Sequence, residues 1–346
     1  MNKTRKKIRV LVVDDSRLFR NTLKKAMESD PGIEVVGMAS DAYEARDKII
    51  ELRPDVMTLD VQMPRMNGLE FLKKLMPQYP MPVVVVSSAN NIVFDALHAG
   101  AVDFVEKPAK AEQSVVDAMI AELIVKVKVA SISNVRRKRR PSDRAHVEKK
   151  VKHVPSNCKK MIAIGASTGG TEAIYEVIRH FPADCVPTVI VQHMPPVFTK
   201  LYAERMNQSC KVNVKEARDG DWLRQGTVLI APGEYHMRLE RRGKEYKIRL
   251  SREDKVNGHR PSVDVMFESV ARLAAGNAVG VILTGMGRDG ARGLLEMRQR
   301  GARTIGQDSE TSIVYGMPKV AFDLGAVEYQ MPLLDISSQI LKLISE

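Results

Sequence analysis

Short runs of β-branched and aliphatic residues recur over residues 8–125 and alternate with stretches of helical periodicity. Their length and unbroken apolar character are typical of parallel strands that are covered on both faces. Such alternation favours a doubly wound parallel α/β sheet. The predicted strands are Ile8–Val13, Ile33–Met38, Val56–Leu59, Val83–Val86 and Val102–Val105, and the predicted helices are Arg17–Met27, Ala42–Glu51, Leu69–Met76, Ile92–His98 and Glu112–Val129.

A second region with the same alternation begins at Met161. Strand Met161–Ile164, helix Glu172–Arg179 and strand Val186–Val191 follow one another, and Gly-rich turns separate the later apolar runs. This pattern predicts a second α/β domain. Its further predicted strands are Thr227–Ile230, Tyr246–Leu250, Val279–Leu283 and Thr304–Ile305.

The segment between the two regions lacks hydrophobic periodicity and is strongly basic. Residues 126–160 hold thirteen Lys or Arg against two acids, a net charge of +11 in a chain whose total is +12. So little apolar surface cannot drive independent folding, which predicts a flexible linker. The expected organisation is a domain over residues 1–125, a basic flexible linker over 126–158 and a second domain over 159–346.

The composition narrows the class of protein further. Hydrophobic residues make up 44% of the chain and charged residues 28%, as in ordinary globular proteins. The three cysteines show no metal-ligand spacing and suit a reducing compartment, so a cytoplasmic location is expected. The run Ile8–Val13 is too short for a signal peptide, and no stretch approaches the roughly 18 apolar residues of a membrane span.

Polar residues end several predicted strands of the first domain. Asp14 and Asp15 follow the first strand, Asp60 the third, Ser87 the fourth and Lys107 the fifth. Ligands bind at the carboxyl ends of strands in such sheets, so these side chains should converge. A lone aspartate would more simply be a solvated loop end. Three clustered carboxylates need a hard cation such as Mg²⁺, beside which one carboxylate can attack a phosphoryl group.

Four segments of this domain, VLVVDDS, PDVMTLDVQMPRMNGLE, PVVVVSS and GAVDFVEKP, resemble the receiver domain of two-component response regulators over residues 8–125. The resemblance implies that Asp60 is the phosphoacceptor. It also implies a Mg²⁺ site formed by Asp14, Asp15, Asp60 and the backbone carbonyl of Gln62. The residues implied to respond to phosphorylation are Ser87 (switch hydroxyl), Phe104 (switch aromatic) and Lys107 (phosphate-binding ammonium).

A glycine-rich turn follows the first strand of the second domain. Residues 165–170, GASTGG, fit G-x-S-x-G at a strand-to-helix turn, which would project Ser167 beside a helix N-terminus. Alone, the pattern also fits a plain glycine-rich turn or a phosphate cradle. A dinucleotide site is disfavoured, because Ser167 stands where G-x-G-x-x-G needs glycine and the next strand ends in Gln192-His193 and not in an acid.

The next strand end supplies a candidate base for this serine. His193 follows Val186–Val191 and could face Ser167 at the carboxyl edge of the sheet. His236 and His259 lie in predicted loops that could also reach the rim of the site, so the sequence leaves them open.

The candidate acid is Asp289, in the glycine-rich loop LTGMGRDG after another apolar strand. Gly285, Gly287 and Gly290 would let backbone N–H groups of this loop turn inward as an oxyanion hole. The chain order Ser–His–Asp differs from the Ser–Asp–His order of α/β-hydrolases, so the G-x-S-x-G match does not assign that fold.

Four segments of the second domain, GASTGG, VIVQHMPP, HRPSVDVMF and LTGMGRDGARGL, resemble the catalytic domain of chemotaxis protein-glutamate methylesterases, the CheB family, from Met161 to about the end. The resemblance implies that Ser167, His193 and Asp289 form the catalytic triad, with Thr168 and Met286 at the oxyanion region. The segment RPSVD belongs to the family pattern, but the sequence alone gives it no physical role.

This resemblance implies a flavodoxin-like receiver followed by a Rossmann-like hydrolytic domain, two doubly wound parallel sheets in all. It implies phosphorylation-activated hydrolysis of glutamate γ-methyl esters on methyl-accepting chemoreceptors, with deamidation of glutamines as a related reaction. A chemotaxis histidine kinase would be the phosphodonor. Mg²⁺ would serve receiver phosphorylation, and the esterase would need no cofactor.

A rival interpretation is a phosphorylation-controlled binding module that uses the basic linker on nucleic acid. No helix-turn-helix pattern follows the linker, and a triad has no purpose in that account, so neither a nucleic-acid partner nor a membrane span is expected. The linker is most simply a solvated spacer. A weaker hypothesis is that it attracts an acidic receptor surface or an anionic leaflet.

Overall fold

The described part of the first unit is built around a five-stranded sheet in the order β2-β1-β3-β4-β5, with every pair parallel. β3 and β4 are buried along their whole lengths, as their unbroken aliphatic runs require of a sheet covered on both faces. The strands are β1 (Ile8–Val13), β2 (Ile33–Ala39), β3 (Val56–Asp60), β4 (Val83–Ser87) and β5 (Asp103–Glu106).

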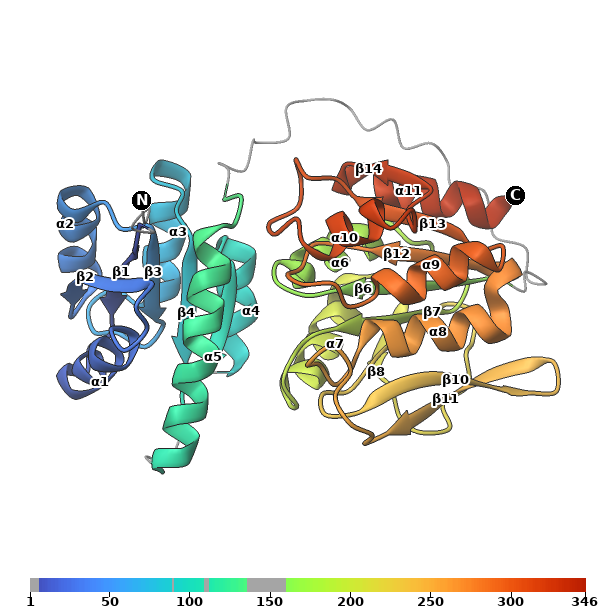
Figure 1. Cartoon of the computed structure of the whole chain (residues 1–346), viewed down its shortest axis with the longest axis horizontal. Coiled ribbons are helices and arrows are strands. Elements are labelled where there is room, and N and C mark those ends of the chain that lie inside the picture. The colour runs from blue at the N-terminus through green and yellow to red at the C-terminus, as the bar shows by residue number, and fades with distance from the viewer. Residues whose placement is uncertain (1–5, 89, 109–111, 136–159) are drawn as a thin grey trace, which may run out of the picture. The chain divides into compact units, whose positions relative to one another are not determined.

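The computed structural model describes residues 6–88, 90–108, 112–135 and 160–346, and the chain divides into two compact units, residues 1–142 and 143–346 (Figure 1). The predicted start of the linker at residue 126 lies inside the last helix of the first unit, α5 (Gln113–Ser131). The helix continues because Val127, Val129 and Ala130 are buried against the unit. Most of the predicted linker, residues 136–158, lies outside the described residues.

Side-chain caps fix the start of three helices in this unit. Ser16 accepts from the N–H of Phe19, Asp41 accepts from the N–H groups of residues 43 and 44, and Asn67 accepts from the N–H of Glu70. α1 and α5 pack together, as do α3 and α4, so helices cover both faces of the sheet (Figure 1). The helices before α5 are α1 (Arg17–Met27), α2 (Ala42–Leu52), α3 (Gly68–Gln78) and α4 (Asn90–Ala99).

The second unit contains, in its described residues, a seven-stranded parallel sheet in the order β14-β13-β12-β6-β7-β9-β8. From the central β6 the chain passes through β7 to the edge strand β8 and then inserts β9 between these two. It next builds the other side through β12, β13 and β14, so the order reverses at β6 and β12. The strands are β6 (Met161–Ala166), β7 (Thr188–Gln192), β8 (Asn213–Glu216), β9 (Thr227–Ile230), β12 (Ala278–Ile282), β13 (Arg303–Gln307) and β14 (Tyr329–Met331).

Helices flank this sheet, and α8 and α9 pack side by side against one face of it (Figure 1). The fully buried Phe267 of α8 lies in the core together with Val263 of the same helix and Met161 of β6. The helices are α6 (Gly170–Ile178), α7 (Phe198–Ser209), α8 (Val263–Ala274), the short 3₁₀ helix η1 (Ala275–Asn277), α9 (Ala291–Gln299), α10 (Met317–Asp323) and α11 (Leu333–Ser345).

The predicted strand at Tyr246–Leu250 exists, but it lies outside the parallel sheet. It belongs to β11 (Glu245–Ser251), which pairs antiparallel with β10 (His236–Arg242) as a separate hairpin. Ser269 Oγ of α8 accepts a hydrogen bond from the N–H of Leu239 at 3.0 Å, which ties the hairpin to that helix. β10 alternates buried and polar positions, a pattern that suits a strand with one solvated face.

The two doubly wound parallel sheets confirm the predicted fold class. Among the described helices, none is long and apolar enough to cross a membrane.

Candidate functional site

Three carboxylates meet at the carboxyl edge of the first sheet, as the strand ends predict. Asp14 and Asp15 follow β1 and Asp60 ends β3, and one carboxylate oxygen of each lies within 4.8 Å of the others. Lys107 follows β5, and its ammonium donates to Asp14 Oδ2 at 2.7 Å and to Asp60 Oδ2 at 2.9 Å. The four side chains thus form one cluster.

The cluster carries more negative charge than its one ammonium balances. Burial is the largest effect on Asp14 and, with the charge of Asp60, raises the pKa of that carboxyl despite the opposing hydrogen bond and charge of Lys107. Burial would lower the pKa of Lys107, but the hydrogen bonds and charges of Asp14 and Asp60 raise it on balance. A set of hard oxygen donors with surplus negative charge fits Mg²⁺.

The other residues predicted for this site lie around the cluster. The N–H of Gln62 donates to Asp60 Oδ1 at 2.9 Å, and the role of the Gln62 carbonyl as a metal ligand stays a prediction. Ser87 is buried at the end of β4. Phe104 is buried in β5 and packs edge-on against Phe94, with the ring centroids 6.5 Å apart.

Ser167 and His193 lie side by side in the second unit because they follow adjacent strands. The last paired residues of β6 and β7 are Ala166 and Gln192, and the N–H of His193 donates to the carbonyl of Ala166 at 3.2 Å. Asp289 follows β12, the neighbour of β6 on the other side. All three therefore meet where the strand order reverses, the usual position of a ligand site in an open α/β sheet.

The contact between His193 and Asp289 assigns the imidazole tautomer. His193 Nε2 lies 2.8 Å from Asp289 Oδ2. Burial would raise the pKa of Asp289, but the hydrogen bond and charge of His193, with further hydrogen bonds, lower it well below its usual range. An ionised Asp289 must accept, so Nε2 carries a proton, and in the neutral imidazole Nδ1 then carries the lone pair. Nδ1 is buried and has no hydrogen-bond partner in the described part of the chain, so it can receive a proton.

Asp289 accepts five hydrogen bonds from described residues. His193 and the N–H of Val263 (2.6 Å) donate to Oδ2. Ser262 Oγ (2.7 Å), Asn257 Nδ2 (2.9 Å) and the N–H of Asp264 (3.3 Å) donate to Oδ1. Two of these donors are backbone groups in the first turn of α8, where the helix dipole also favours a negative charge.

The segment RPSVD therefore has a physical role that the sequence did not give it. It begins α8 and supplies Ser262 Oγ and two backbone donors to the carboxylate of Asp289. The sequence signal was present, because a serine directly before an apolar helical run is a typical N-cap pattern. Its target could not be predicted, because Asp289 lies after β12, far along the chain.

The two other candidate histidines, His236 and His259, have different surroundings in the structure. His236 is buried, accepts from the N–H of Ser262 at Nδ1 (3.2 Å) and pairs with the carbonyl of Asp254 through Nε2 (2.9 Å). Both of its nitrogens are occupied, so it has a structural role. The ring of His259 stacks on the ring of His193 and belongs to the site.

The loop predicted to form the oxyanion hole lies beside Ser167, and its role in binding an oxyanion stays a prediction. The N–H of Gly285 donates to the carbonyl of Val314 at 3.0 Å and is therefore already occupied. Glycine is needed there because a Cβ would lie 2.7 Å from the Cβ of Ser167. The N–H of Met286 makes no hydrogen bond to any described residue, whereas Thr168 is buried and accepts from Thr284 Oγ1 at 3.0 Å through its carbonyl.

A pocket of about 490 Å³ opens beside these residues. It lies against Asp289 and against His259, whose ring stacks on that of His193, so it opens next to the contact between His193 and Asp289. Its lining residues are Asn257, His259, Gly287, Arg288, Asp289 and Val320.

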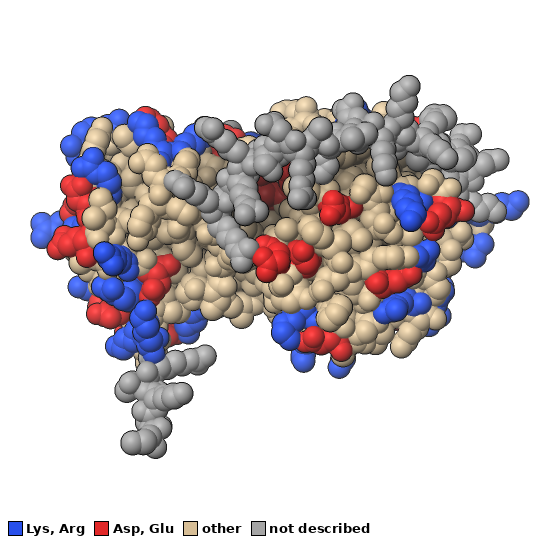
Figure 2. Space-filling view, turned by 90° about the horizontal axis from the view of Figure 1, so that it is seen from above, with Lys and Arg blue, Asp and Glu red and all other residues tan. Residues whose placement is uncertain are grey.

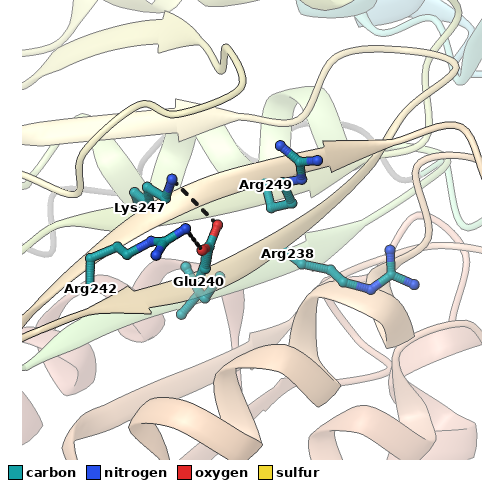
Figure 3. Close-up of a pocket in the computed structure, with 6 residues that line it drawn as sticks. Arg238, Glu240, Arg242, Lys247 and Arg249 are labelled. Atoms are coloured by element: carbon teal, nitrogen blue, oxygen red, sulfur yellow. Dashed lines mark ion pairs between the residues drawn. The ribbon is translucent and has the colours of Figure 1, made fainter.

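A second hollow, of about 430 Å³, lies on the polar face of the β10–β11 hairpin (Figure 3). Arg242 and Lys247 both point to Glu240, at 2.7 Å and 3.4 Å. Arg238 and Arg249 pair with Glu253 and Asp219 outside the lining, so much of the positive charge is neutralised. The hollow is lined by no serine, cysteine or histidine, and we assign it no catalytic role.

Lys and Arg are interspersed with Asp and Glu on the face of each unit seen in Figure 2. That face shows no broad basic patch on the described surface of either unit, unlike a typical nucleic-acid-binding domain.

Two known families match the two units of the chain. Residues 10–119 match the family described as response regulator receiver domain, and residues 162–340 match the family described as CheB methylesterase.

Full-length relatives and a solved structure agree with these matches. The chain is 55% identical over 343 residues to a protein-glutamate methylesterase/protein-glutamine glutaminase of Syntrophomonas wolfei, covering 99% of each chain. It is 52% identical over 342 residues to the protein of the same name from Agrobacterium fabrum, covering 97% of this chain and 96% of the relative. The catalytic domain of Thermotoga maritima CheB methylesterase matches with 38% identity and a TM-score of 0.52, over 53% of this chain and 98% of that one.

Proposed function

Because the chain belongs to the CheB methylesterase family, we propose that it hydrolyses glutamate γ-methyl esters on chemoreceptors and that phosphorylation of Asp60 activates this reaction. The observation that carries the proposal is the hydrogen bond from His193 Nε2 to Asp289 (2.8 Å), which leaves the buried Nδ1 unprotonated next to the strand end that bears Ser167. Ser167, His193 and Asp289 are the triad of this proposal.

The first half of the reaction transfers the glutamyl group to the enzyme. Ser167 Oγ attacks the γ-carbonyl carbon while His193 Nδ1 takes the hydroxyl proton. The N–H of Met286 and the oxyanion region near Thr168 stabilise the negative oxygen of the tetrahedral intermediate. The intermediate collapses, the bond to the methoxy oxygen breaks, and His193 returns the proton so that methanol leaves.

The second half restores the serine. A water molecule attacks the glutamyl ester of Ser167 while His193 Nδ1 accepts its proton. The bond to Ser167 Oγ then breaks, His193 returns the proton to Oγ, and the glutamate carboxylic group leaves. A glutamine side chain can follow the same route, because only the leaving group changes from methanol to ammonia. Deamidation is therefore part of the proposal, in keeping with the names of the relatives.

Control of the enzyme is assigned to the first unit. A chemotaxis histidine kinase or a small phosphodonor supplies the phosphoryl group, and Asp60 accepts it. Mg²⁺, held by Asp14, Asp15 and Asp60, would neutralise the phosphoryl oxygens. Lys107 contributes its ammonium, and Ser87 and Phe104 respond to the modified carboxylate. We assign the basic segment over residues 136–158, which lies outside the described residues, the role of a tether.

In the unphosphorylated protein, the receiver restrains the catalytic unit, and phosphorylation shifts the population to an active state. Deletion of residues 1–150 should therefore raise basal methanol release and remove any response to a phosphodonor. A deletion variant with the basal rate of the full chain would contradict restraint by the receiver.

The activity itself is tested by methanol release from a methylated chemoreceptor fragment, with and without a small phosphodonor and Mg²⁺. The full chain should release methanol faster with the phosphodonor, and Ser167→Ala should release none above background. Ser209→Ala is the matched control, because Ser209 is exposed and its hydroxyl donates to the backbone carbonyl of Arg205 in the same helix. Absence of release from the full chain under both conditions would overturn the proposed substrate.

A further inference from the structure

A four-residue turn, Val256–His259, contacts both the histidine and the aspartate of the proposed triad. Val256 and His259 exchange two backbone hydrogen bonds, of 3.1 Å and 2.9 Å. The two residues between them have positive φ angles, 53° for Asn257 and 83° for Gly258. Two successive positive φ angles define a type I′ turn, for which Asn-Gly is the favoured pair.

In this left-handed conformation, the side chain of Asn257 contacts two buried carboxyl groups. Its Nδ2 donates to Asp264 Oδ2 at 2.7 Å and to Asp289 Oδ1 at 2.9 Å. Asp264 is buried, and burial together with the charge of Asp289 raises its pKa. One amide group thus joins two neighbouring carboxyl groups that would otherwise repel each other, and it fixes the direction of Asp289.

His259, at the other end of the turn, covers one face of His193. The two ring centroids lie 3.8 Å apart and the ring planes differ by 10°, a face-to-face stack. Burial, followed by the charge of His193, lowers the pKa of His259 to about 4, so its ring is neutral near pH 7. A neutral partner adds no repulsion when His193 becomes an imidazolium during catalysis.

From these contacts we propose that the Val256–His259 turn is a positioning clamp for the triad. Asn257 holds the carboxylate of Asp289, and His259 holds the plane of the His193 ring. The inference rests on the proposed function, because it concerns the same serine chemistry.

The His193 ring needs a second contact to fix its orientation. His193 is held by one hydrogen bond at Nε2, while the reacting Nδ1 has no partner among the described residues. One hydrogen bond leaves the ring free to tilt about the line through Nε2, and such a tilt would carry Nδ1 away from the serine. The stacked ring blocks that motion. Displacement of a reacting group by about 1 Å can cost roughly a hundredfold in rate.

The test compares variants of the full chain that remove the ring or keep its shape. His259→Ala should lower kcat for methanol release by roughly 10- to 100-fold with KM unchanged, whereas His259→Phe should restore most of kcat. Asn257→Gly keeps the turn, since glycine accepts positive φ, but removes the amide, and it should lower kcat about tenfold. His180→Ala, at an exposed histidine outside the site, is the matched control.

A second readout separates failure of the clamp from failure of the proposed substrate. The rate at which a fluorophosphonate labels Ser167 depends on the activated serine and needs no receptor, so it should fall in His259→Ala and recover in His259→Phe. Absence of methanol release from the unmodified chain would contradict the proposed function and leave this labelling comparison intact.

Three results would overturn the clamp. The first is a His259→Ala variant with unmodified kcat and labelling rate. The second is a His259→Phe variant as slow as His259→Ala, since the imidazole itself would then be required. The third is a rise in KM alone, which would make His259 a substrate contact. Hydrogen exchange of β6 and β7 should be unchanged in each variant. Faster exchange in His259→Ala would indicate a folding defect, and the His259→Phe and Asn257→Gly variants would then decide.

Discussion

Asp14 and Asp289 follow parallel strands of their respective sheets, and each is only 1% exposed, yet their surroundings move their pKa values in opposite directions. Burial and the nearby Asp60 raise the pKa of Asp14, against the opposing effect of Lys107. The hydrogen bonds around Asp289 outweigh burial and lower its pKa. Position at a strand end therefore does not determine what a buried aspartate does, whereas the number and type of its donors do.

The difference corresponds to two kinds of site. The cluster around Asp60 has three carboxylates and one ammonium, and in the proposed function a cation supplies the missing charge before a phosphoryl group approaches. The carboxylate of Asp289 has all its hydrogen bonds before any substrate arrives, which is the preorganisation that acyl transfer requires. One edge is built to respond to an added charge, and the other is built to stay fixed.

The largest expected effect comes from disturbing the fixed site. Asp289→Asn should lower kcat for methanol release by about 10⁴-fold, measured with the phosphodonor present. The amide NH₂ of asparagine would donate to Nε2, which would shift the imidazole proton to Nδ1 and remove the base. Asp323→Asn is the control, because Asp323 is exposed and pairs with Lys319 one turn away. An Asp289→Asn variant within tenfold of the unmodified rate would mean that this carboxylate does not set the tautomer.

The sequence predicted the part of both sites that depends on strand ends. Asp60 and Lys107 converge because every strand of a parallel sheet ends at the same edge, and the same rule brings Ser167 and His193 together. The alternating apolar runs were sufficient for this, because buried parallel strands are recognisable from composition.

The contacts that hold Asp289 could not be predicted in the same way. Asn257 and His259 lie in a turn with no periodicity, and Ser262 begins a helix after that turn. An Asn-Gly pair favours a tight turn, but only the folded backbone brings this one next to residues that follow β7 and β12. The hairpin containing β10 was missed for a related reason, since its exposed face is rich in arginine and hides the strand pattern.

A smaller effect is expected at the responsive site. Asp60→Asn should abolish the increase in methanol release on addition of phosphodonor and Mg²⁺, a stimulation we expect to be roughly 10- to 100-fold for two states that differ by a few kcal/mol. Asparagine has no carboxylate to form the acyl phosphate. Asp47→Asn, at an exposed aspartate paired with the adjacent Arg46, should keep the full response. A stimulated Asp60→Asn variant would place the phosphoacceptor on another residue of the cluster.

The smallest expected effect is on the hydrogen exchange of β3 and β4 in the full chain, which reports the cost of the surplus negative charge at Asp14. Because folding raises the pKa of Asp14, its ionised form destabilises the receiver, and this cost grows as the pH rises from the unfolded value through the folded one. Asp14→Asn removes the charge and can still accept from the N–H of Ser16 (2.9 Å), so exchange without Mg²⁺ should become slower.

Mg²⁺ at ten times its Kd should slow exchange in the unmodified chain by roughly tenfold, about 1.4 kcal/mol, and should have little effect on Asp14→Asn. Faster exchange in Asp14→Asn would show that the ion pair with Lys107 outweighs burial and repulsion at Asp14, and the two buried aspartates would then be stabilised in the same way.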